Sequence, residues 1–552
     1  MAAEYGDLVS NMSSPEPSVD SGPAGLPARA SVPARVAAAA GLVATGVALA
    51  AGELGAGVVA GIPSPVAAVS RVIVDLQPPG AKEFVVGLFG TADKLALQLF
   101  VVLVALVIGA LVGLVGRRRV GLGMAAIGGF VIVGLAASLR DPQSVPVLAA
   151  TGAALEFALG AAALDRLIRL ARGADQPVGA GWAGGGAASM PDTTSRASMP
   201  DWGRRRFLIS GGILAVASVA VGSVGRYLVA GRRPATVSTL PPVEDPVSLP
   251  AGADLGIQGL TPIVVANADF YQIDTSIVPP HIDRDTWRLR IHGMVDHEVL
   301  LSYADLVKLP VIEQYVTIAC VSNRVGGDLV GNAKWTGVRL RDVLDLAGVK
   351  PGATQLVGRS ADGWTAGSPT AWVMDPEREP MLAFGMNGQP LPAEHGYPAR
   401  VIVPGLYGYV SATKWVTELE LTTLEAFDAY WIPLGWAKEA PILTQSRIDR
   451  PGNGNVLSAG NFTFAGVAWA PDRGIAKVEV QLDDAPWVEA SLSQPISKAT
   501  WVQWKLDASV ASGGHKVRVR ATDRTGATQT ETVTRPDPNG ARGWHTVPFT
   551  VA

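Results

Sequence analysis

Apolar residues are concentrated in the first part of the chain, before residue 230. Five stretches there carry few charges, and each is close to the roughly 20 residues that cross the hydrocarbon core of a bilayer. They run over about residues 36–60, 95–115, 120–139, 145–164 and 207–225. The pattern predicts an N-terminal all-α transmembrane bundle of about five helices, the transmembrane region of residues 36–230.

Basic residues flank these stretches in a regular way. Arginines precede the first, separate the second from the third, follow the fourth and precede the fifth: Arg29, Arg35, Arg117, Arg118, Arg119, Arg166, Arg169, Arg172, Arg204, Arg205 and Arg206. Five spans with the N-terminus inside put all of these on the cytoplasmic side, as the positive-inside rule requires. Residues 61–94 are then an outer loop, and we expect everything after residue 225 to lie on the extracytoplasmic side of the cell membrane.

The start of the fifth stretch carries a second signal. Arg204-Arg205-Arg206-Phe207-Leu208 resembles a twin-arginine export signal, which is read by a receptor for proteins that cross the membrane already folded. The alternative is an ordinary basic flank of a membrane span.

Polar and small residues mark two segments without regular structure. Residues 1–35, rich in Ser, Pro, Ala and Gly, are predicted to be a disordered cytoplasmic tail. Residues 231–260 are predicted to be an external linker. The chain is thus expected to leave the membrane through a linker before its second half begins.

The second half alternates between short strand patterns and short helices, which predicts an α+β catalytic domain over residues 261–430. Residues 440–552 differ, because short alternating strands are separated there by Gly, Pro and Asp turns. That spacing favours a β-sandwich of immunoglobulin type without its disulfide. The whole chain is therefore expected to be multi-domain.

Composition narrows the function. With 45 Lys+Arg against 48 Asp+Glu and no basic stripe, the chain has no electrostatic footprint for nucleic acid. A single cysteine excludes an intrachain disulfide and a Cys-cluster metal site. All six histidines lie after residue 280, so the apolar half has none to ligate haem. Glu53 and Glu156 lie within spans without a visible basic partner there, and an interhelical hydrogen bond is favoured over a proton path.

The only cysteine, Cys320, follows the β-rich run 315–319 and precedes a polar loop with Asn323 and Arg324. A thiol at a strand end is placed to meet a ligand, its thiolate suits a transition metal, and a nearby arginine favours the ionised form. The alternative is a small buried apolar residue, which most lone cysteines are.

A second cluster joins His395, Arg400 and Lys414 around a strand flanked by Gly and Pro turns. Arginine offers a fork for phosphate oxygens, lysine a point charge, and turn amides an anion-binding concavity. An anionic ligand and a salt-bridged sheet edge explain this cluster equally well.

Several separated motifs together resemble the sulfite oxidase family of molybdopterin enzymes over roughly residues 261–552. They are Asn267-Ala268-Asp269-Phe270-Tyr271, Thr317-Ile318-Ala319-Cys320 with Asn323-Arg324, Trp335-Thr336-Gly337-Val338-Arg339-Leu340, Asp362-Gly363, the five-residue spacing of His395 and Arg400, and Lys414-Trp415. The tail, with Gly474–Val480 and Trp544-His545, is similar to the family's immunoglobulin-like dimerisation domain, so the resemblance implies a possible homodimer.

The resemblance implies a molybdenum–molybdopterin cofactor, with the metal held by a pterin dithiolene and the Cys320 thiolate. Arg400 and Lys414 are expected to neutralise the pterin phosphate and His395 to hydrogen-bond the cofactor. Asn267, Phe270 and Tyr271 are expected to close its other side, and Asn323, Arg324 and Asp362 to contact it. The cofactor carries the chemistry, and the protein supplies ligation, orientation and access.

Two departures bear on the substrate. The family's second arginine after Asn-Arg is Val325 here, and Ile273 and Thr275 stand where animal enzymes have Arg-x-His. A pocket short of these groups is expected to bind sulfite poorly. We expect the substrate to be a small oxyanion or an oxide, and its identity stays open.

No Cys-x-x-Cys-His motif occurs, so we expect no haem in this chain. Electrons would then pass through a redox partner, a cytochrome or a quinone-linked protein. The alternatives are a reductase of S- or N-oxides with the same cofactor, and a non-catalytic membrane-anchored binding protein that acts through its immunoglobulin-like domain.

Overall fold

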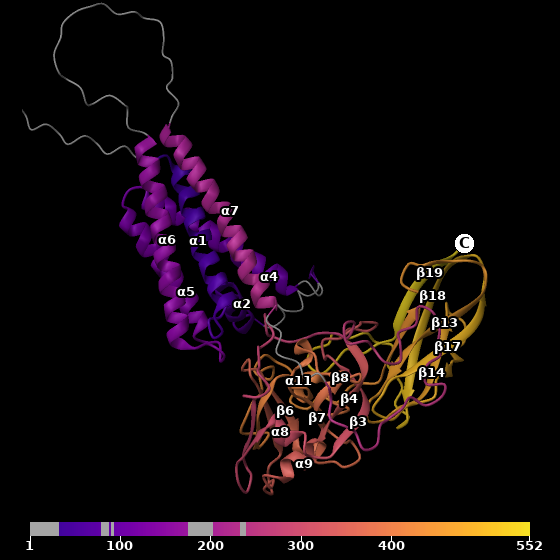
Figure 1. Cartoon of the computed structure of the whole chain (residues 1–552). Coiled ribbons are helices and arrows are strands. Elements are labelled where there is room, and N and C mark those ends of the chain that lie inside the picture. The colour runs from indigo at the N-terminus through magenta and orange to yellow at the C-terminus, as the bar shows by residue number, and fades with distance from the viewer. Residues whose placement is uncertain (1–31, 79–87, 90–92, 175–201, 232–238) are drawn as a thin grey trace, which may run out of the picture.

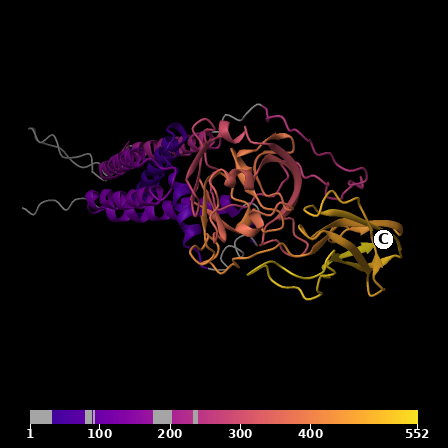
Figure 2. The same ribbon diagram turned by 90° about the horizontal axis from the view of Figure 1, so that it is seen from below.

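The computed structural model describes residues 32–78, 88–89, 93–174, 202–231 and 239–552. Most of the predicted tail, residues 1–31, and residues 232–238 of the predicted linker lie outside this range. A helical bundle, a mixed α/β domain and a β-rich C-terminal domain follow one another along the molecule, with the mixed domain in the middle (Figures 1 and 2).

The N-terminal part of the described chain is helical. Five of its helices are long and apolar enough to cross a membrane, which confirms the five predicted apolar helices. The membrane-length helices are α1 (Ala34–Val58), α4 (Asp93–Gly116), α5 (Val120–Ser138), α6 (Pro146–Ala174) and α7 (Trp202–Gly231). The shorter helix α2 (Pro65–Asp75) lies between α1 and α4 in the chain. Helices α6 and α7 extend well beyond the predicted stretches, because charged residues such as Asp165 and Arg169, paired at 2.7 Å, continue the helix.

Helix α1 lies against α4, α6 and α7. A Cβ added to Gly41 would come within 2.0 Å of the Gly109 carbonyl oxygen, and one on Gly113 within 1.9 Å of the Ala37 carbonyl oxygen. Small residues therefore let the backbones of α1 and α4 approach closely, which is how helices associate where the solvent is as apolar as the side chains.

Helix α2 lies within the segment that the sequence analysis treats as an outer loop. Pro65 occupies its first turn, and the Ser64 hydroxyl accepts a hydrogen bond from the Ala67 amide at 3.1 Å. Val66, Val69 and Ile73 provide an apolar face at helical spacing. These N-cap and spacing signals are present in the sequence, so the predicted outer loop contains a short helix over residues 65–75.

Glu53 of α1 has several partners. One carboxylate oxygen accepts hydrogen bonds from the Ser64 hydroxyl at 2.7 Å and the Val66 amide at 3.2 Å. The other lies 3.7 Å from the Arg226 guanidinium. The expectation of no basic partner was wrong, because α7 continues past residue 225 and brings Arg226 alongside α1.

The middle domain contains two sheets. The first has the order β2-β1-β10-β5-β6, with β1 and β10 parallel and the other pairs antiparallel. Its strands are β1 (Arg288–Gly293), β2 (Val299–Ser302), β5 (Gln355–Ser360), β6 (Thr365–Pro369) and β10 (Val416–Thr422). The second has the order β3-β4-β7-β8, with β9 paired to β7. Its strands are β3 (Val311–Ala319), β4 (Val330–Arg339), β7 (Met381–Met386), β8 (Gln389–Pro390) and β9 (Arg400–Ile402).

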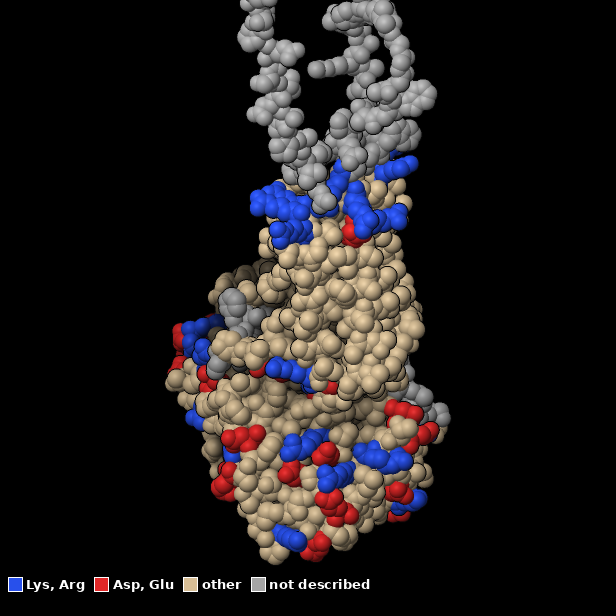
Figure 3. Space-filling view, turned by 90° about the vertical axis from the view of Figure 1, so that its left-hand side faces the viewer, with Lys and Arg blue, Asp and Glu red and all other residues tan. Residues whose placement is uncertain are grey.

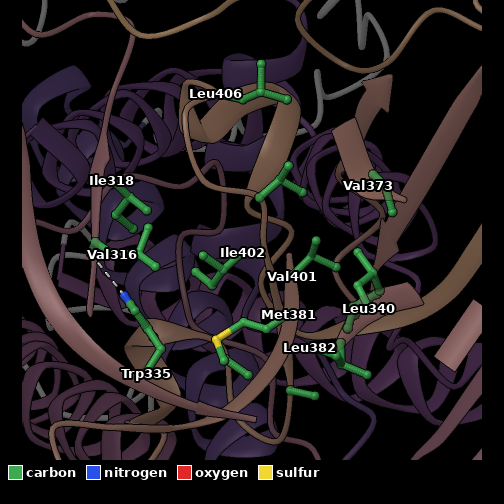
Figure 4. Packing of buried hydrophobic residues seen from close by; sticks show 14 of the residues in the cluster. Val316, Ile318, Trp335, Leu340, Val373, Met381, Leu382, Val401, Ile402 and Leu406 are labelled. Carbon is green, nitrogen blue, oxygen red and sulfur yellow. Dashed lines mark hydrogen bonds between the residues drawn. The ribbon is translucent and has the colours of Figure 1, made fainter. Parts of the chain in front are cut away.

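Short helices connect these strands: α8 (Tyr303–Leu306), α9 (Leu340–Asp345), α10 (Thr370–Val373), η2 (Ala393–His395) and α11 (Gly408–Ser411). The core beneath the second sheet is shown in Figure 4, where Trp335 of β4 is fully buried and its indole nitrogen donates to the Val316 carbonyl of β3 at 3.3 Å. A buried tryptophan contributes a large apolar area and also needs a hydrogen-bond partner, which this contact supplies. The core thereby fixes β3, the strand that ends just before Cys320.

The C-terminal domain is β-rich, as predicted, and its two sheets share one buried core. The sheet β11-β13-β17-β16 contains β11 (Gln445–Arg450), β13 (Gly460–Trp469), β16 (Ser491–Leu492) and β17 (Val502–Val510). The sheet β12-β19-β18-β14-β15 contains β12 (Val456–Leu457), β14 (Ile475–Leu482), β15 (Val488–Glu489), β18 (Gly513–Asp523) and β19 (His545–Val551). Trp501, which precedes β17, donates to the Ile263 carbonyl at 2.9 Å and joins this domain to the middle one.

Candidate active site

One cavity in the middle domain collects most of the predicted site residues. The space between the atoms that line it is about 920 Å³, its opening included. Seven predicted residues line it: Phe270, Tyr271, Cys320, Asp362, His395, Arg400 and Lys414. These residues come from segments up to 144 positions apart, since 414 − 270 = 144. Asn267, Asn323 and Arg324 do not line this cavity.

Cys320 directly follows β3 and begins a tight loop. Its amide donates to the Leu329 carbonyl at 2.9 Å, and its thiol lies 2.9 Å from the Ser322 hydroxyl. The buried Asn323 side chain accepts from the Leu329 amide at 3.0 Å, so it closes the loop from within. Arg324 is exposed on the outer side of the loop. The loop geometry therefore presents the thiol and the Ser322 hydroxyl to the cavity.

The C-terminal domain supports the same loop. The Arg447 guanidinium donates to the Gly327 carbonyl at 3.0 Å. Gly326 has φ +76° and packs against the His545 ring, where a Cβ would come within 2.2 Å of the imidazole. Burial, helped by the Arg447 charge, lowers the pKa of His545 to about 4, so this ring is neutral and its Nδ1 accepts from the Ile448 amide at 2.9 Å. Two domains thus hold the cysteine loop.

Arg400, at the start of β9, is the only guanidinium among the lining residues of the cavity. It is almost fully buried, one terminal nitrogen donates to the His395 carbonyl at 3.1 Å, and its guanidinium lies 5.0 Å from the Trp335 ring centre. Burial lowers the pKa of Arg400 to about 10, so it remains charged near neutral pH. Its Nε has no hydrogen-bond partner in the described part of the chain. An unpartnered buried donor on a cation is costly, and an anion in the cavity would satisfy it.

Lys414 pairs with Asp274, which lies outside the predicted motifs. Its ammonium lies 2.6 Å from Asp274 and also donates to the Glu394 carbonyl at 2.9 Å. Lys94, at the start of α4, binds the same Asp274 and donates to the Ser276 carbonyl at 2.8 Å. Burial alone would raise the pKa of Asp274, but the two ammonium groups hold it well below its usual range. Burial lowers the pKa of Lys414 despite its partner.

His395, at the end of η2, lies edge-on to Phe270 with ring centres 5.7 Å apart. Its Nε2 donates to the Asn267 carbonyl at 2.9 Å. Burial lowers the pKa of His395 to about 4, so the ring is neutral and Nδ1 is its acceptor nitrogen. The Asn267 side chain accepts from Asn387 at 2.8 Å and lies behind the cavity, so Asn267 fixes the orientation of His395 from outside.

Aromatic residues outside the predicted set of site residues cover much of the cavity wall, and among them only Trp415 belongs to a predicted motif. They are Trp364, Tyr409, Trp415, Trp431 and Trp436. Tyr409 donates to the Ala437 carbonyl at 2.6 Å and packs against Trp436, which in turn meets Trp431 edge-on. Trp431 and Trp436 lie between β10 and β11, where only proximity in the folded chain reveals their role. Ile273 and Thr275 also line the cavity, whereas Val325 does not.

The outer end of the helical bundle lies on the rim of this cavity. Arg71 of α2 donates to the Asp362 carbonyl, and the Tyr430 hydroxyl donates to the Asp75 carboxylate at 2.8 Å. One oxygen of the buried Asp362 side chain accepts from the Trp364 amide at 3.1 Å. The other has no partner within the described residues. Helix α2 is thus in direct contact with residues of the catalytic cavity.

Comparison with known families places two matches on these domains. Residues 276–431 match the oxidoreductase molybdopterin binding domain, and residues 439–547 match the Mo-co oxidoreductase dimerisation domain.

Individual relatives agree with these matches. Human mitochondrial sulfite oxidase is 32% identical over 288 residues, which are 44% of this chain and 52% of that protein. NADH nitrate reductase 1 of rice is 29% identical over 316 residues, 46% of this chain and 34% of that protein. The uncharacterized oxidoreductase YuiH of Bacillus subtilis is 35% identical over 162 residues, 29% of this chain and 78% of that protein. The chain spans about half the length of the sulfite oxidases that it matches.

Among solved structures, the sulfane dehydrogenase SoxCD from Paracoccus pantotrophus aligns with a TM-score of 0.46 and 25% identity. The alignment covers 52% of this chain and 81% of that one.

Proposed function

The chain belongs to the sulfite oxidase family of molybdopterin oxidoreductases, and we propose that it is a membrane-anchored enzyme that transfers an oxygen atom at a molybdenum ligated by Cys320. One observation carries the proposal: Cys320, His395, Arg400 and Lys414, predicted from separate motifs, line a single cavity. When bound, the molybdenum–pterin group supplies a two-electron centre that takes up or gives up an oxygen atom. Because the family consists of oxidoreductases, the alternative of a non-catalytic binding protein is dropped.

The donors and acceptors of the cavity fit such a group. The unpartnered Nε of Arg400 and the charged Lys414 suit a phosphate, and the unpartnered carboxylate oxygen of Asp362 suits a ring N–H donor. His395 offers the acceptor Nδ1 of a neutral imidazole. The Cys320 thiolate is the soft ligand that a transition metal prefers, and the Ser322 hydroxyl can donate to it.

Asp274 has a role that follows from charge. Without an anion, it neutralises Lys414 and Lys94 at the cavity. When a phosphate binds Lys414, Asp274 keeps Lys94 as a partner, so its carboxylate is not left unpaired in a buried position. Lys94 therefore allows Lys414 to exchange partners at low cost.

The described helices support the predicted orientation in the membrane. Figure 3 shows lysine and arginine side chains gathered at the end of the bundle that is remote from the catalytic domain. The arginines after α4, those in the last part of α6, and Arg205 and Arg206 near the start of α7 belong to this end of the bundle, and Arg172 donates to the Arg117 carbonyl at 3.3 Å. With this end in the cytoplasm, the catalytic domain lies outside the membrane.

Export through the twin-arginine motif is tested by replacing Arg204 and Arg205 with lysine. If the motif is an export signal, the catalytic domain stays inside, and added protease cannot reach it in spheroplasts. Continued cleavage from outside would show that the arginines serve only as a topological flank.

The C-terminal domain supports two further predictions. Its two sheets around one core suit an immunoglobulin-like sandwich, and its match to a dimerisation domain suits a homodimer. Mass measurement of the detergent-solubilised protein should give twice the chain mass of 57.2 kDa after correction for detergent. A single chain mass at micromolar protein would contradict the homodimer.

A second candidate function is favoured by the cavity wall. Arg400 and Lys414 are the only cationic residues that line the cavity, and both are assigned to the cofactor. The remaining wall is largely aromatic, which suits a neutral organic S- or N-oxide better than sulfite. Loaded protein should then reduce dimethyl sulfoxide faster than it oxidises sulfite. The opposite order would assign the enzyme to sulfite.

The proposed function is tested most simply by composition. Protein purified in detergent from cells with a working cofactor pathway should contain molybdenum and pterin in amounts close to stoichiometric. Only trace amounts of both would contradict the proposal.

A further inference from the structure

A second large cavity lies within the helical bundle, between α2, α4, α5 and α6. The space between the atoms that line it is about 1140 Å³, its opening included. Its wall is aliphatic and aromatic, with Val66, Val69, Phe100 and Phe130 among the lining residues, and the only charged residue in that wall is Glu156 of α6. Such a wall suits a lipid-soluble ligand.

Glu156 has no evident structural purpose. Only 8% of its surface is exposed, and no donor within the described residues hydrogen-bonds to its carboxyl group. One of its oxygens lies against Gly52 of α1, where a Cβ would come within 2.5 Å of it. An acid held in hydrocarbon without a partner is costly, and acids in such positions line substrate or proton paths. The ligand should therefore carry a polar group that this carboxyl can meet.

A second buried acid, Glu53, directly follows the residue that Glu156 contacts. Gly52, which Glu156 contacts, precedes Glu53, and Glu53 accepts the Ser64 hydroxyl proton at 2.7 Å. Ser64 also lines a further cavity with polar side chains at the junction of the bundle and the catalytic domain, where Asp141 and His281 lie. Ser64 therefore links Glu53 to the catalytic side of the bundle.

Helix α2 connects the two large cavities. Its residues Val66, Val69 and Ile73 line the bundle cavity, and its residues Arg71 and Asp75 contact Asp362 and Tyr430 at the rim of the catalytic cavity. Pro65, which also lines the bundle cavity, and Arg71 are six residues apart, or about 9 Å along the helix axis. One short helix therefore separates the apolar cavity from the proposed redox centre.

We propose that the bundle cavity binds a lipid-soluble quinone, with a ring oxygen at Glu156 and the isoprenoid tail along the aliphatic wall. This inference rests on the proposed function, because a two-electron centre outside the membrane needs a two-electron partner. The balance closes: substrate and water give the oxidised substrate, two protons and two electrons, and quinone with two electrons and two protons gives quinol. A reductase runs both halves in reverse. A phospholipid would fill the apolar wall but leaves the buried Glu156 without a partner.

The first experiment measures binding of decylubiquinone to the full-length protein in detergent, by quenching of tryptophan emission. Gly134 of α5 lines the cavity, and a Cβ there meets nothing within 4 Å, so Gly134→Phe fills the cavity without a local clash. Gly121 lies on the same helix outside the cavity, and a Cβ there also meets nothing within 4 Å, so Gly121→Phe is the matched control. Gly134→Phe should weaken binding at least about tenfold, the effect of a 1.4 kcal/mol loss, and Gly121→Phe should not change it.

The second experiment follows electrons. Loaded protein is reduced with dithionite, desalted and mixed with decylubiquinone, and quinol formation is recorded by absorbance. Glu156→Gln keeps the shape of the side chain but cannot donate a proton, so quinol formation should slow by about 100-fold, a typical effect of losing a general acid. Binding of decylubiquinone by this variant should change far less than the rate.

Two results would overturn the inference. One is the absence of saturable decylubiquinone binding with phospholipid retained in the purified protein, and the other is an equal effect of Gly134→Phe and Gly121→Phe. Ferricyanide separates this outcome from a failure of the proposed function. If the reduced protein is reoxidised by ferricyanide but not by decylubiquinone, the proposed oxidoreductase function is supported and the proposed quinone site is contradicted.

Discussion

The catalytic cavity and the bundle cavity both adjoin α2 and suit different ligands. The catalytic cavity contains a thiol, a guanidinium, an ammonium, an imidazole and two carboxylates among aromatic rings. The bundle cavity is apolar apart from Glu156. The first suits an anionic cofactor with polar edges, and the second suits a carrier that dissolves in lipid. The difference indicates that a single chain can combine water-phase chemistry with a membrane-phase electron partner.

The catalytic domain and the helical bundle are also stabilised in different ways. In the catalytic domain, buried charges are balanced by partners distant in sequence, as Asp274 is by Lys94 and Lys414. In the bundle, stability comes from close backbone contact at Gly41, Gly109 and Gly113. Removal of Asp274 should therefore destabilise the catalytic domain, whereas substitutions at these glycines should act on the bundle.

The largest effect is expected for Asp274→Asn. The change leaves Lys414 buried without a carboxylate, and breaking a buried ion pair in this way costs about 3–5 kcal/mol. Guanidinium unfolding of cofactor-free protein, followed by tryptophan emission, measures the loss. Asp285→Asn is the control, because that carboxylate is exposed and its pair with Arg284 is worth at most about 1 kcal/mol. Equal losses in both variants would show that Asp274 is not needed for charge balance.

A second effect is expected for Arg400→Met. Loss of a charged hydrogen-bond donor to the cofactor costs about 1.5–3 kcal/mol, or roughly a ten- to hundredfold weaker hold on the pterin. Pterin content after extensive dialysis measures it. Decylubiquinone binding should stay at the wild-type value, because Arg400 does not line the bundle cavity. A parallel loss of both ligands would mean that the two cavities are not independent.

Much of the catalytic cavity could be predicted from the sequence, because its motifs are local. Cys320 follows a strand, and His395 and Arg400 bracket a turn, so short patterns identify them. The five apolar helices could be predicted from the length and low charge of five apolar stretches in the sequence. The structure separates three of the predicted residues from the cavity wall: Asn267 accepts a hydrogen bond from His395, Asn323 closes the cysteine loop, and Arg324 is exposed. Their assignment as cofactor contacts remains a prediction.

Other parts could not be predicted, because they depend on contacts between distant segments. Lys94 and Asp274 are 180 positions apart, and nothing in either neighbourhood indicates their pairing. Trp431 and Trp436 line the cavity from a segment without a motif. Helix α2 is a different case. Ser64, Pro65 and the apolar spacing in the sequence indicate a short helix, which the prediction of an outer loop did not include.

A smaller effect concerns pH. The pKa of His545 is about 4 in the folded protein, below its ordinary value of 6.5, because burial disfavours the charged ring. Between these values the unfolded chain holds the extra proton, so stability should fall as pH drops from 6.5 to about 4 and then level off. Thermal denaturation at a series of pH values measures this. His395 has a similarly lowered pKa and adds to the same trend.

His545→Asn isolates the contribution of His545. Asparagine can still accept from the Ile448 amide but cannot be protonated, so the variant should lose less stability in this pH range than the wild type. An unchanged pH profile would contradict the role given to His545 beneath the cysteine loop.

The smallest effect is expected for Tyr430→Phe, which removes the hydrogen bond to Asp75 of α2. A bond of this kind contributes about 0.5–1.5 kcal/mol. Quinol formation should slow by at most about tenfold, the rate equivalent of 1.4 kcal/mol, while oxidation by ferricyanide stays constant. A loss in both assays would place Tyr430 in the catalytic cavity rather than at its contact with the bundle.

The central claim is that Cys320 ligates the metal. X-ray absorption at the molybdenum edge, on loaded wild-type protein and on Cys320→Ser, tests it directly. The account predicts that the variant keeps its pterin, shows one sulfur ligand fewer around the metal and loses turnover. An unchanged sulfur shell in Cys320→Ser would contradict it.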